Sequence, residues 1–180
     1  QARSLLGIDA PKSTPVEIIR AILKLPVDLH WNGGIGTYVK ASWEANSAVG
    51  DRTNDAVRVD GRDLRCKVVG EGGNLGCSQL GRIEDSLRGG RMNTDFVDNS
   101  GGVDCSDHEV NIKIQLKAVQ ERTRMTTAER NRLLESMTED VGQLVLRDNY
   151  LQSQAISLLQ AAAPERLGEH AHFIRSPELD

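Results

Sequence analysis

Val-Val-Gly-Glu-Gly-Gly-Asn-Leu-Gly, at residues 68–76, carries the clearest structural signal in this sequence. It joins a short apolar run that favours a β-strand to a glycine pair with an asparagine beside it, and residues 78–87 then follow a helical pattern. Glycine lets the backbone approach a ligand closely, and asparagine offers a hydrogen-bond donor and an acceptor on a short side chain. A turn of this kind at the carboxyl end of a parallel strand is typical of α/β proteins that bind a small ligand there.

Residues 99–109, Asn-Ser-Gly-Gly-Val-Asp-Cys-Ser-Asp-His-Glu, have a similar composition. We expect Asn99 to lie at the end of a strand, with the glycine pair after it leaving space for a ligand. A helix is expected from Asp104 onward, which places Ser106 near its first turn, where a hydroxyl and free N–H groups bind carboxylates well. The alternative is that Ser106 or Asp104 only caps this helix.

A third glycine-rich stretch, Asn-Gly-Gly-Ile-Gly-Thr at residues 32–37, follows the strand expected at residues 27–31. Its backbone N–H groups are suited to a phosphate, but the same residues also make an ordinary tight turn. The spacing is not that of a dinucleotide fingerprint, and no Lys-Ser or Lys-Thr follows to make a P-loop. This stretch alone is weak evidence for a site.

The remaining pattern predicts an α/β fold followed by a helical layer. The strand, helix and strand expected within residues 66–97 favour a parallel pair with a right-handed crossover. Residues 110–116 alternate like a strand, but their flanking sequence favours a helix. Strands are expected at 27–31, 66–69 and 92–97, and helices at 14–25, 78–87, from 104 onward, at 130–137 and at 140–163, with capping boxes at Thr14, Thr126 and Ser136.

Composition narrows the function classes. The chain has 180 residues, 38% of them hydrophobic, and a formal net charge of −4, which argues against nucleic acid and anionic membranes as main partners. Three cysteines without paired spacing, and no signal peptide or long apolar run, favour a reducing, cytoplasmic setting. Because the chain begins at Gln1 and ends in a polar segment, we expect it to be part of a longer polypeptide.

Cys105 and His108 are the residues that suggest a metal or a nucleophile. They lack further ligands at suitable spacing, since Cys66, Cys77 and His30 are scattered along the chain. As a thiol–imidazole pair they lack a group that would orient the imidazole. We therefore predict neither a metal site nor a catalytic cysteine.

These motifs resemble a known family. Residues 69–74 resemble the strand followed by Glu-Gly-Ala-Asn-Gly-Pro of glutamate dehydrogenases, and residues 99–106 resemble their Asn-Ala-Gly-Gly-Val-x-x-Ser. Residues 29–40 and 50–55 are similar to the large NAD-specific glutamate dehydrogenases of bacteria. Gly73 departs from this pattern, because the family has alanine at that position, and so do the two residues after Asn74.

The resemblance implies roles for single residues. Asn74 matches an asparagine at the nicotinamide–ribose end of NAD, and Asn99 matches one that hydrogen-bonds the nicotinamide amide. Ser106 matches a serine that holds the side-chain carboxylate of glutamate. The implied cofactor-binding residues are Asn74, Asn99, Gly73, Asn32 and Gly33, and the implied substrate-binding residues are Ser106 and Val103.

The resemblance also implies a fold and an activity. Residues 1–122 would be the second half of a Rossmann-like NAD-binding domain, and residues 123–180 a C-terminal helical segment. The reaction would be oxidative deamination of L-glutamate to 2-oxoglutarate and ammonia, in a homo-oligomer. The family's catalytic lysine and aspartate have no counterpart here, so we expect no catalytic residue in this segment and no activity without the remainder of the parent chain. The alternative is a non-catalytic α/β-helical assembly module.

Overall fold

The computed structural model describes residues 5–8 and 12–176, and the chain divides into two compact units, residues 1–99 and 100–180. Each unit is described by itself below. The first unit contains, in chain order, α2 (Pro15–Leu23), β1 (Leu29–Asn32), β2 (Val39–Lys40), α3 (Asn46–Val49), η1 (Arg52–Asn54), β3 (Val59–Asp60), η2 (Gly61–Asp63), β4 (Val68–Glu71), α4 (Gln79–Leu87), β5 (Arg91–Met92) and α5 (Asp95–Asp98). The second contains α6 (Ser100–Arg122), α7 (Thr127–Ser136), α8 (Thr138–Ala162) and α9 (Leu167–Arg175).

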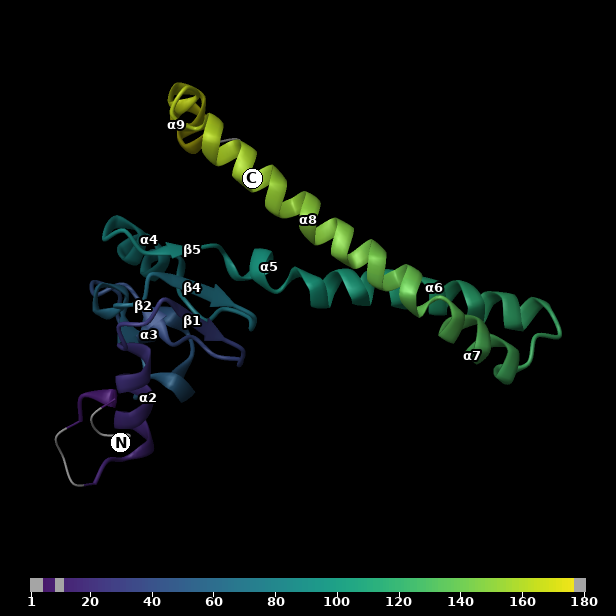
Figure 1. Cartoon of the computed structure of the whole chain (residues 1–180), viewed down its shortest axis with the longest axis horizontal. Helices are drawn as coiled ribbons and strands as arrows, with labels where there is room; N and C mark the ends of the chain where they lie inside the picture. Colours follow the sequence, from purple (N-terminus) through teal and green to yellow (C-terminus); the bar gives the residue numbers. More distant parts are fainter. Residues whose placement is uncertain (1–4, 9–11, 177–180) are drawn as a thin grey trace. The chain divides into compact units, whose positions relative to one another are not determined.

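The first unit is built on small parallel sheets. Among the described residues, β1, β4 and β5 form one sheet in that order, all parallel, and β2 pairs with β3 in a second one (Figure 1). Leu29 is the register partner of Val68, and Asn32 that of Glu71, so β1 and β4 end at the same level. The predicted strand–helix–strand unit is confirmed as β4, α4 and β5. The fold is therefore α/β with parallel strands.

Helix termini follow the local signals of the sequence. Thr14 caps α2 and forms a complete capping box with Glu17. Thr126 and Glu129 do the same for α7, and the Ser78 side chain accepts from Gly81 N–H at the start of α4. Each of these bonds satisfies a backbone N–H group that has no partner inside its helix.

The core of the first unit is small and aliphatic. Two free thiols belong to it, since Cys66 and Cys77 are both buried. Tyr38 and Met92 pack against the cluster, whose buried members are Leu23, Val39, Val59, Leu64, Cys66, Val69 and Cys77. Because Val69 of β4 belongs to this core, the core fixes the position of β4 and of the glycine-rich turn that follows it.

The structure corrects several sequence predictions. The strand expected at residues 92–97 is wrong: β5 ends at Met92, and Asp95–Asp98 form the short helix α5. Asn99 therefore caps the C-terminus of α5 and does not end a strand. The capping box predicted at Ser136 is also wrong, because α7 runs through Ser136, whose hydroxyl donates to the Leu133 carbonyl.

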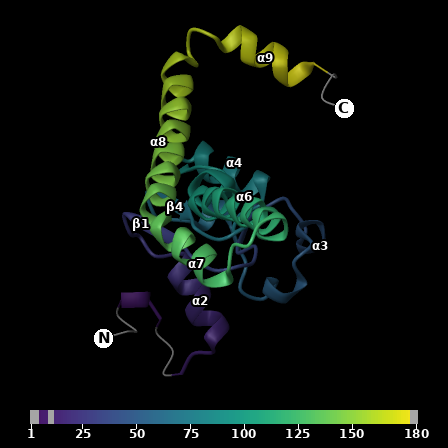
Figure 2. The same ribbon diagram turned by 90° about the vertical axis from the view of Figure 1, so that its right-hand side faces the viewer.

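All the regular secondary structure in the described part of the second unit is helical. The helical interpretation of residues 110–116 is confirmed, but α6 begins at Ser100 and not near Asp104. α6 packs along α8, and the Ser100 hydroxyl and Asp104 both bond the side chain of Asn149 on α8. α9 turns away from the end of α8 after residues 163–166 (Figure 2).

Little of this helical unit is buried. Among its described residues only Ser100 falls in the buried class, and large apolar side chains of α8 are exposed, including Leu146 at 66% and Leu158 at 65%. None of the described helices is long and apolar enough to cross a membrane. Part of the apolar surface of α8 therefore lacks a cover within the described residues.

Candidate functional site

Two glycine-rich turns meet at the carboxyl ends of β1 and β4. The turn after β4 begins at Glu71, and the Gly73 N–H donates to the carbonyl of Asn32, the last residue of β1, at 3.0 Å. The Asn32 side chain accepts from the Gly34 N–H at 3.3 Å, which shapes the turn after β1. The two strand-end turns that lie side by side are thus formed by residues 32–37 and 71–76. Residues 99–109, where we expected a strand end, do not form one.

Trp31 covers the outer side of the turn after β4. A Cβ atom at Gly72 would lie 2.6 Å from the Trp31 ring, and one at Gly70 would also meet this ring. At both positions the absence of a Cβ atom lets the Trp31 ring lie against the backbone. The Trp31 side chain is itself 59% exposed and forms part of the rim of this edge.

Asn74 and Asn99, two candidate cofactor residues, meet at this edge. The Asn99 Nδ2 atom donates to the Gly73 carbonyl at 2.9 Å and to the Asn74 Oδ1 atom at 2.6 Å. Asn74 is exposed and Asn99 is half-buried, so the pair faces solvent. The structure thus brings together Asn32, Gly33, Gly73, Asn74 and Asn99, all five residues that the sequence assigned to cofactor binding.

Hydrogen-bond chemistry fixes the orientation of both amides. A carbonyl only accepts, so the Gly73 oxygen requires the NH₂ group of Asn99, and that NH₂ group in turn requires the oxygen of Asn74. Asn99 Oδ1 and Asn74 Nδ2 remain for a ligand. The pair therefore offers one acceptor and one donor, and these are the two kinds of group with which a primary carboxamide pairs.

A buried ion pair holds the turn after β4 in place. Glu71 is fully buried, and its carboxylate accepts from Arg82 Nε at 2.8 Å and from Arg82 Nη2 at 3.1 Å. The same carboxylate accepts from the Cys77 N–H at 3.2 Å, so it bonds the far end of the turn as well. Because a planar guanidinium and a carboxylate match in two places, this pair is both strong and directional.

Sequence reasoning missed Arg82 and Asp95 as parts of this site. Arg82 lies in the middle of α4, and its Nη2 atom also reaches Asp95 at 3.2 Å. An arginine in a helix is usually exposed to solvent, so the residue type alone did not indicate that Arg82 is buried. The available signal was Glu71 itself, an acid at the end of an apolar strand, which needs a partner when buried.

The structure places the candidate substrate residues on α6. Ser106 is exposed and lies well inside this helix, since α6 begins at Ser100. Our expectation of free N–H groups beside Ser106 is therefore wrong, because N–H groups beyond the first turn bond within the helix. Val103 is 55% exposed and lies one turn before Ser106, and residues three apart share a helix face.

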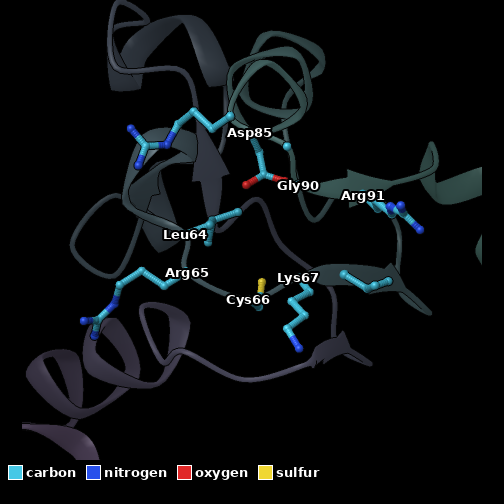
Figure 3. A pocket seen from close by; sticks show the side chains of 10 residues that line it. Leu64, Arg65, Cys66, Lys67, Asp85, Gly90 and Arg91 are labelled. Carbon is cyan, nitrogen blue, oxygen red and sulfur yellow. The ribbon is translucent and has the colours of Figure 1, made fainter.

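A hollow of about 630 Å³ lies at the amino ends of β4 and β5 and is lined in part by Cys66, Lys67, Asp85 and Arg91. In Figure 3 the Asp85 carboxylate and the Cys66 sulfur point into it, whereas Arg65 and Arg91 point away from each other. Its cations therefore do not converge on one anion. The lining of this hollow therefore indicates no particular ligand, whereas the free amide atoms of the asparagine pair do.

Neither buried thiol of the first unit is activated. Burial, with the Asp85 charge nearby, raises the pKa of the Cys66 thiol, and burial raises that of Cys77 well above its ordinary value. A raised pKa disfavours the thiolate that nucleophilic catalysis needs. Among the described residues, no group of three or more histidine, cysteine or acidic side chains is arranged to hold a metal ion.

We expect Asp85→Asn to stabilise the first unit at pH 8 by about 1 kcal/mol, because a neutral amide avoids the cost of burying the carboxylate charge. Burial raises the pKa of the Asp85 carboxyl, with Arg88 opposing, and its Oδ2 atom has no hydrogen-bond partner among the described residues. The folded state thus binds the proton more tightly than the unfolded state, so stability falls as the pH rises through the raised pKa. Hydrogen exchange of residues 64–70 at pH 8 and pH 4 measures this.

The gain from Asp85→Asn should shrink at pH 4, where the folded wild-type side chain carries less charge. Asp28→Asn is the control, because Asp28 pairs with Lys67 at the surface and is 86% exposed. An equal gain at both pH values would show that ionisation of Asp85 does not limit stability.

The amino-acid sequence of this chain is similar to those of known proteins. Residues 1–159 match the family model described as the catalytic domain of bacterial NAD-glutamate dehydrogenase. The chain belongs to this family. Three similar relatives are each named NAD-specific glutamate dehydrogenase: one from Pseudomonas aeruginosa is 59% identical over 174 residues, one from Halomonas elongata 53% over 178 residues, and one from Mycobacterium tuberculosis 52% over 181 residues.

The match spans nearly all of this chain and little of each relative. It covers 97%, 99% and 97% of the chain, respectively, and 11% of the length of each of these three glutamate dehydrogenases. The family resemblance seen in residues 69–74 and 99–106 is confirmed by these matches. Because these two segments contain Asn74 and Asn99, the functional proposal rests on the asparagine pair.

Proposed function

We propose that this chain is the part of an NAD-dependent glutamate dehydrogenase that supplies contacts to the nicotinamide cofactor and to glutamate. The observation that carries the proposal is the fixed pair of amides, Asn99 and Asn74, at the carboxyl ends of β1 and β4. The parallel order of β1, β4 and β5 suits the second half of a Rossmann-like domain. Under this proposal residues 1–122 belong to that domain and residues 123–180 are the C-terminal helical segment.

Asn99 and Asn74 would hold the carboxamide of NAD, which would supply the acceptor for the hydride of the glutamate α-carbon. The residues present fit its carboxamide, because the free amide atoms of Asn99 and Asn74 are complementary to it in kind and order. Asn99 Oδ1 would accept from the carboxamide NH₂ group, and Asn74 Nδ2 would donate to its oxygen. This pairing fixes which face of the ring meets the substrate, so the role of these residues is orientation.

The glycines of the two turns allow this approach. Gly73 lets the turn after β4 lie against the turn after β1, because a Cβ atom there would meet the Gly34 carbonyl. A Cβ atom at Gly33 would come no closer than 3.6 Å to its nearest neighbour, the Trp31 ring, so this backbone is open to a ribose or a ring. Asn32 holds both turns together through its carbonyl and its side chain. We propose that these three residues line the cofactor without taking part in proton transfer, which requires groups from the remainder of the parent chain.

Ser106 and Val103 are proposed to contact glutamate. They share one face of α6, and both are exposed, so a hydroxyl and an apolar side chain are available to one ligand. Ser106 would donate to the side-chain carboxylate, and Val103 would contact the aliphatic part of glutamate. The exposed position favours this role over capping, since Ser106 lies beyond the first turn of α6.

We expect Ser106→Ala to raise KM for glutamate about tenfold in the full-length protein, with KM for NAD unchanged. A hydrogen bond from a hydroxyl to a carboxylate contributes about 1.5 kcal/mol, which corresponds to about tenfold in affinity. Steady-state kinetics with each substrate varied in turn measure this effect. Ser157→Ala is a matched control, because the Ser157 hydroxyl donates to a carbonyl within α8. An unchanged KM for glutamate in Ser106→Ala would exclude Ser106 from the substrate site.

Glutamate-dependent reduction of NAD by the full-length protein tests the proposal as a whole. The 180-residue chain is measured beside it and is expected to be inactive. The 3-acetylpyridine analogue of NAD carries a methyl ketone in place of the carboxamide, so it lacks the donor that Asn99 Oδ1 would accept. We therefore compare the ratio of kcat/KM for the analogue to kcat/KM for NAD. We expect this ratio to be lower in the wild type than in Asn99→Ala. An inactive full-length protein would overturn the proposal.

A second role, in assembly, is favoured by the exposed apolar side chains of α8. We propose that this helical unit packs against the remainder of the parent chain, within a homo-oligomer in the cytoplasm. Helices with uncovered apolar faces gain most of their stability from such packing. Analytical ultracentrifugation tests it: a monomeric full-length protein, or an isolated chain that binds no dye for apolar surfaces, would contradict it. If the full-length protein also reduced no NAD, the chain would be a non-catalytic assembly module.

A further inference from the structure

The short helix α5 holds the glycine-rich turn after β4 at several points. The Asp98 carboxylate accepts from the Glu71 N–H at 2.9 Å, and the Asp95 carboxylate accepts from the Leu75 N–H at 2.8 Å. Between these two points, Asn99 donates to the Gly73 carbonyl. We call Asp95 and Asp98 the acidic clamp, because they bond the backbone at both ends of the turn that carries Asn74.

The acidic clamp is anchored on its other side. The second carboxylate oxygen of Asp95 accepts from Arg82, and its side chain is only 14% exposed. The second carboxylate oxygen of Asp98 accepts from Asn93 Nδ2 at 3.1 Å. Each acid therefore connects the turn to a second, separate group, and neither depends on solvent for its orientation.

The backbone conformation of Leu75 explains why the turn needs a stabilising contact from outside itself. Its φ is 55°, in the left-handed region that residues other than glycine rarely adopt, and this conformation costs about 1–2 kcal/mol. The bond from its N–H group to Asp95 stabilises this conformation from outside. Without it, Leu75 would favour a right-handed conformation, and that change would move the neighbouring Asn74 and the Gly73 carbonyl.

We propose that Asp95 and Asp98 are positioning residues that fix the Asn74–Asn99 pair for reading the carboxamide of the nicotinamide ring; this inference rests on the proposed function. Neither acid touches the ligand. They act because Asn99 keeps its oxygen toward the ligand only while its NH₂ group is held by Gly73 and Asn74. If the turn relaxes, the Asn99 amide is free to rotate and no longer distinguishes a donor from an acceptor.

Asp95→Asn in the full-length protein tests the proposal. Asparagine has the shape of aspartate but offers one acceptor and one donor, whereas two donors, the Leu75 N–H and Arg82 Nη2, face this side chain. We expect the Kd for NADH, measured by fluorescence titration without glutamate, to rise about tenfold, the order of one lost hydrogen bond to a charged group. KM for NAD should rise by the same factor, with kcat and KM for glutamate within about twofold of wild type.

The preference for NAD over its 3-acetylpyridine analogue gives a readout that a merely structural role would not change. We expect the ratio of kcat/KM for NAD to kcat/KM for the analogue to fall in Asp95→Asn and in Asp98→Ala, because both variants loosen the amide that reads the carboxamide. Asp98→Ala removes the acceptor of the Glu71 N–H and leaves the pair of Arg82 with Asp95 intact, so it carries the test alone if Asp95→Asn does not fold.

Two further variants separate the possible failures. Asp28→Asn removes an exposed acid, paired with Lys67 near the opposite end of the strands, and should leave every constant unchanged. Asn99→Ala should raise KM for NAD if the proposed function is right. If Asn99→Ala has this effect while both clamp variants keep the wild-type KM and ratio, the clamp proposal is wrong and the proposed function stands. If Asn99→Ala leaves KM for NAD unchanged, both are wrong.

Discussion

Replacing Arg82 with methionine is expected to accelerate backbone hydrogen exchange in residues 71–77 more than a hundredfold. Glu71 is fully buried and is paired with Arg82 through two hydrogen bonds. Removing one partner of a buried ion pair leaves an uncompensated charge and costs about 3–5 kcal/mol. Local opening of the turn then becomes easier by that amount, and each 1.4 kcal/mol corresponds to about tenfold in exchange rate. Exchange followed by mass spectrometry of the full-length protein measures it.

Arg88→Met is the matched control for this substitution. Arg88 caps the same helix, α4, but is exposed, so its replacement should change exchange by less than about threefold, as for most surface substitutions. The double variant Glu71→Gln with Arg82→Met should recover part of the loss, since it removes the buried charge together with its partner. Normal protection of residues 71–77 in Arg82→Met alone would show that the ion pair does not hold the turn.

The sequence predicted best those elements whose signals are local. Thr14, Ser78 and Thr126 each cap the helix expected after them, because a cap depends on residues only three positions apart. The parallel pairing of β4 and β5 followed from the helix between them. The strand expected at 92–97 failed because Met92, Phe96 and Val97 satisfied a strand pattern, while the helix start at Thr94 and Asp95 was missed.

The site was predicted as a set of residues but not as an arrangement. Asn74 and Asn99 were both named from their motifs, yet no local pattern indicates that residues 25 positions apart share a hydrogen bond. Asn99 reaches the turn because α5 folds back over it, and α5 itself was misread. The supporting charges, Arg82 and Asp95, were missed for the same reason, since their partners are distant in sequence and a charged residue in a helix is ordinarily solvated.

Gly73→Ala is expected to lower kcat/KM for NAD about a hundredfold in the full-length protein. A Cβ atom at Gly73 would lie 2.9 Å from the Gly34 carbonyl carbon and still closer to the carbonyl oxygen. Because the obstacle is backbone, no change of side-chain rotamer relieves it, and one of the two turns must move. Such overpacking costs about 3 kcal/mol, and the displaced turn carries Asn74, so the cost falls on cofactor binding. Steady-state kinetics with NAD varied measure this effect.

Gly34→Ala is the counterpart that isolates the cause. The new methyl group would lie on the facing turn, with no atom within 4 Å, so we expect kcat/KM within about twofold of wild type, as for surface changes. The family pattern that residues 69–74 resemble has alanine at the position of Gly73, and this chain's glycine follows from how closely the turn after β1 approaches. If Gly73→Ala retained wild-type kcat/KM, the turn after β1 would have to yield readily, and contact between the two turns would not set the shape of the cofactor site.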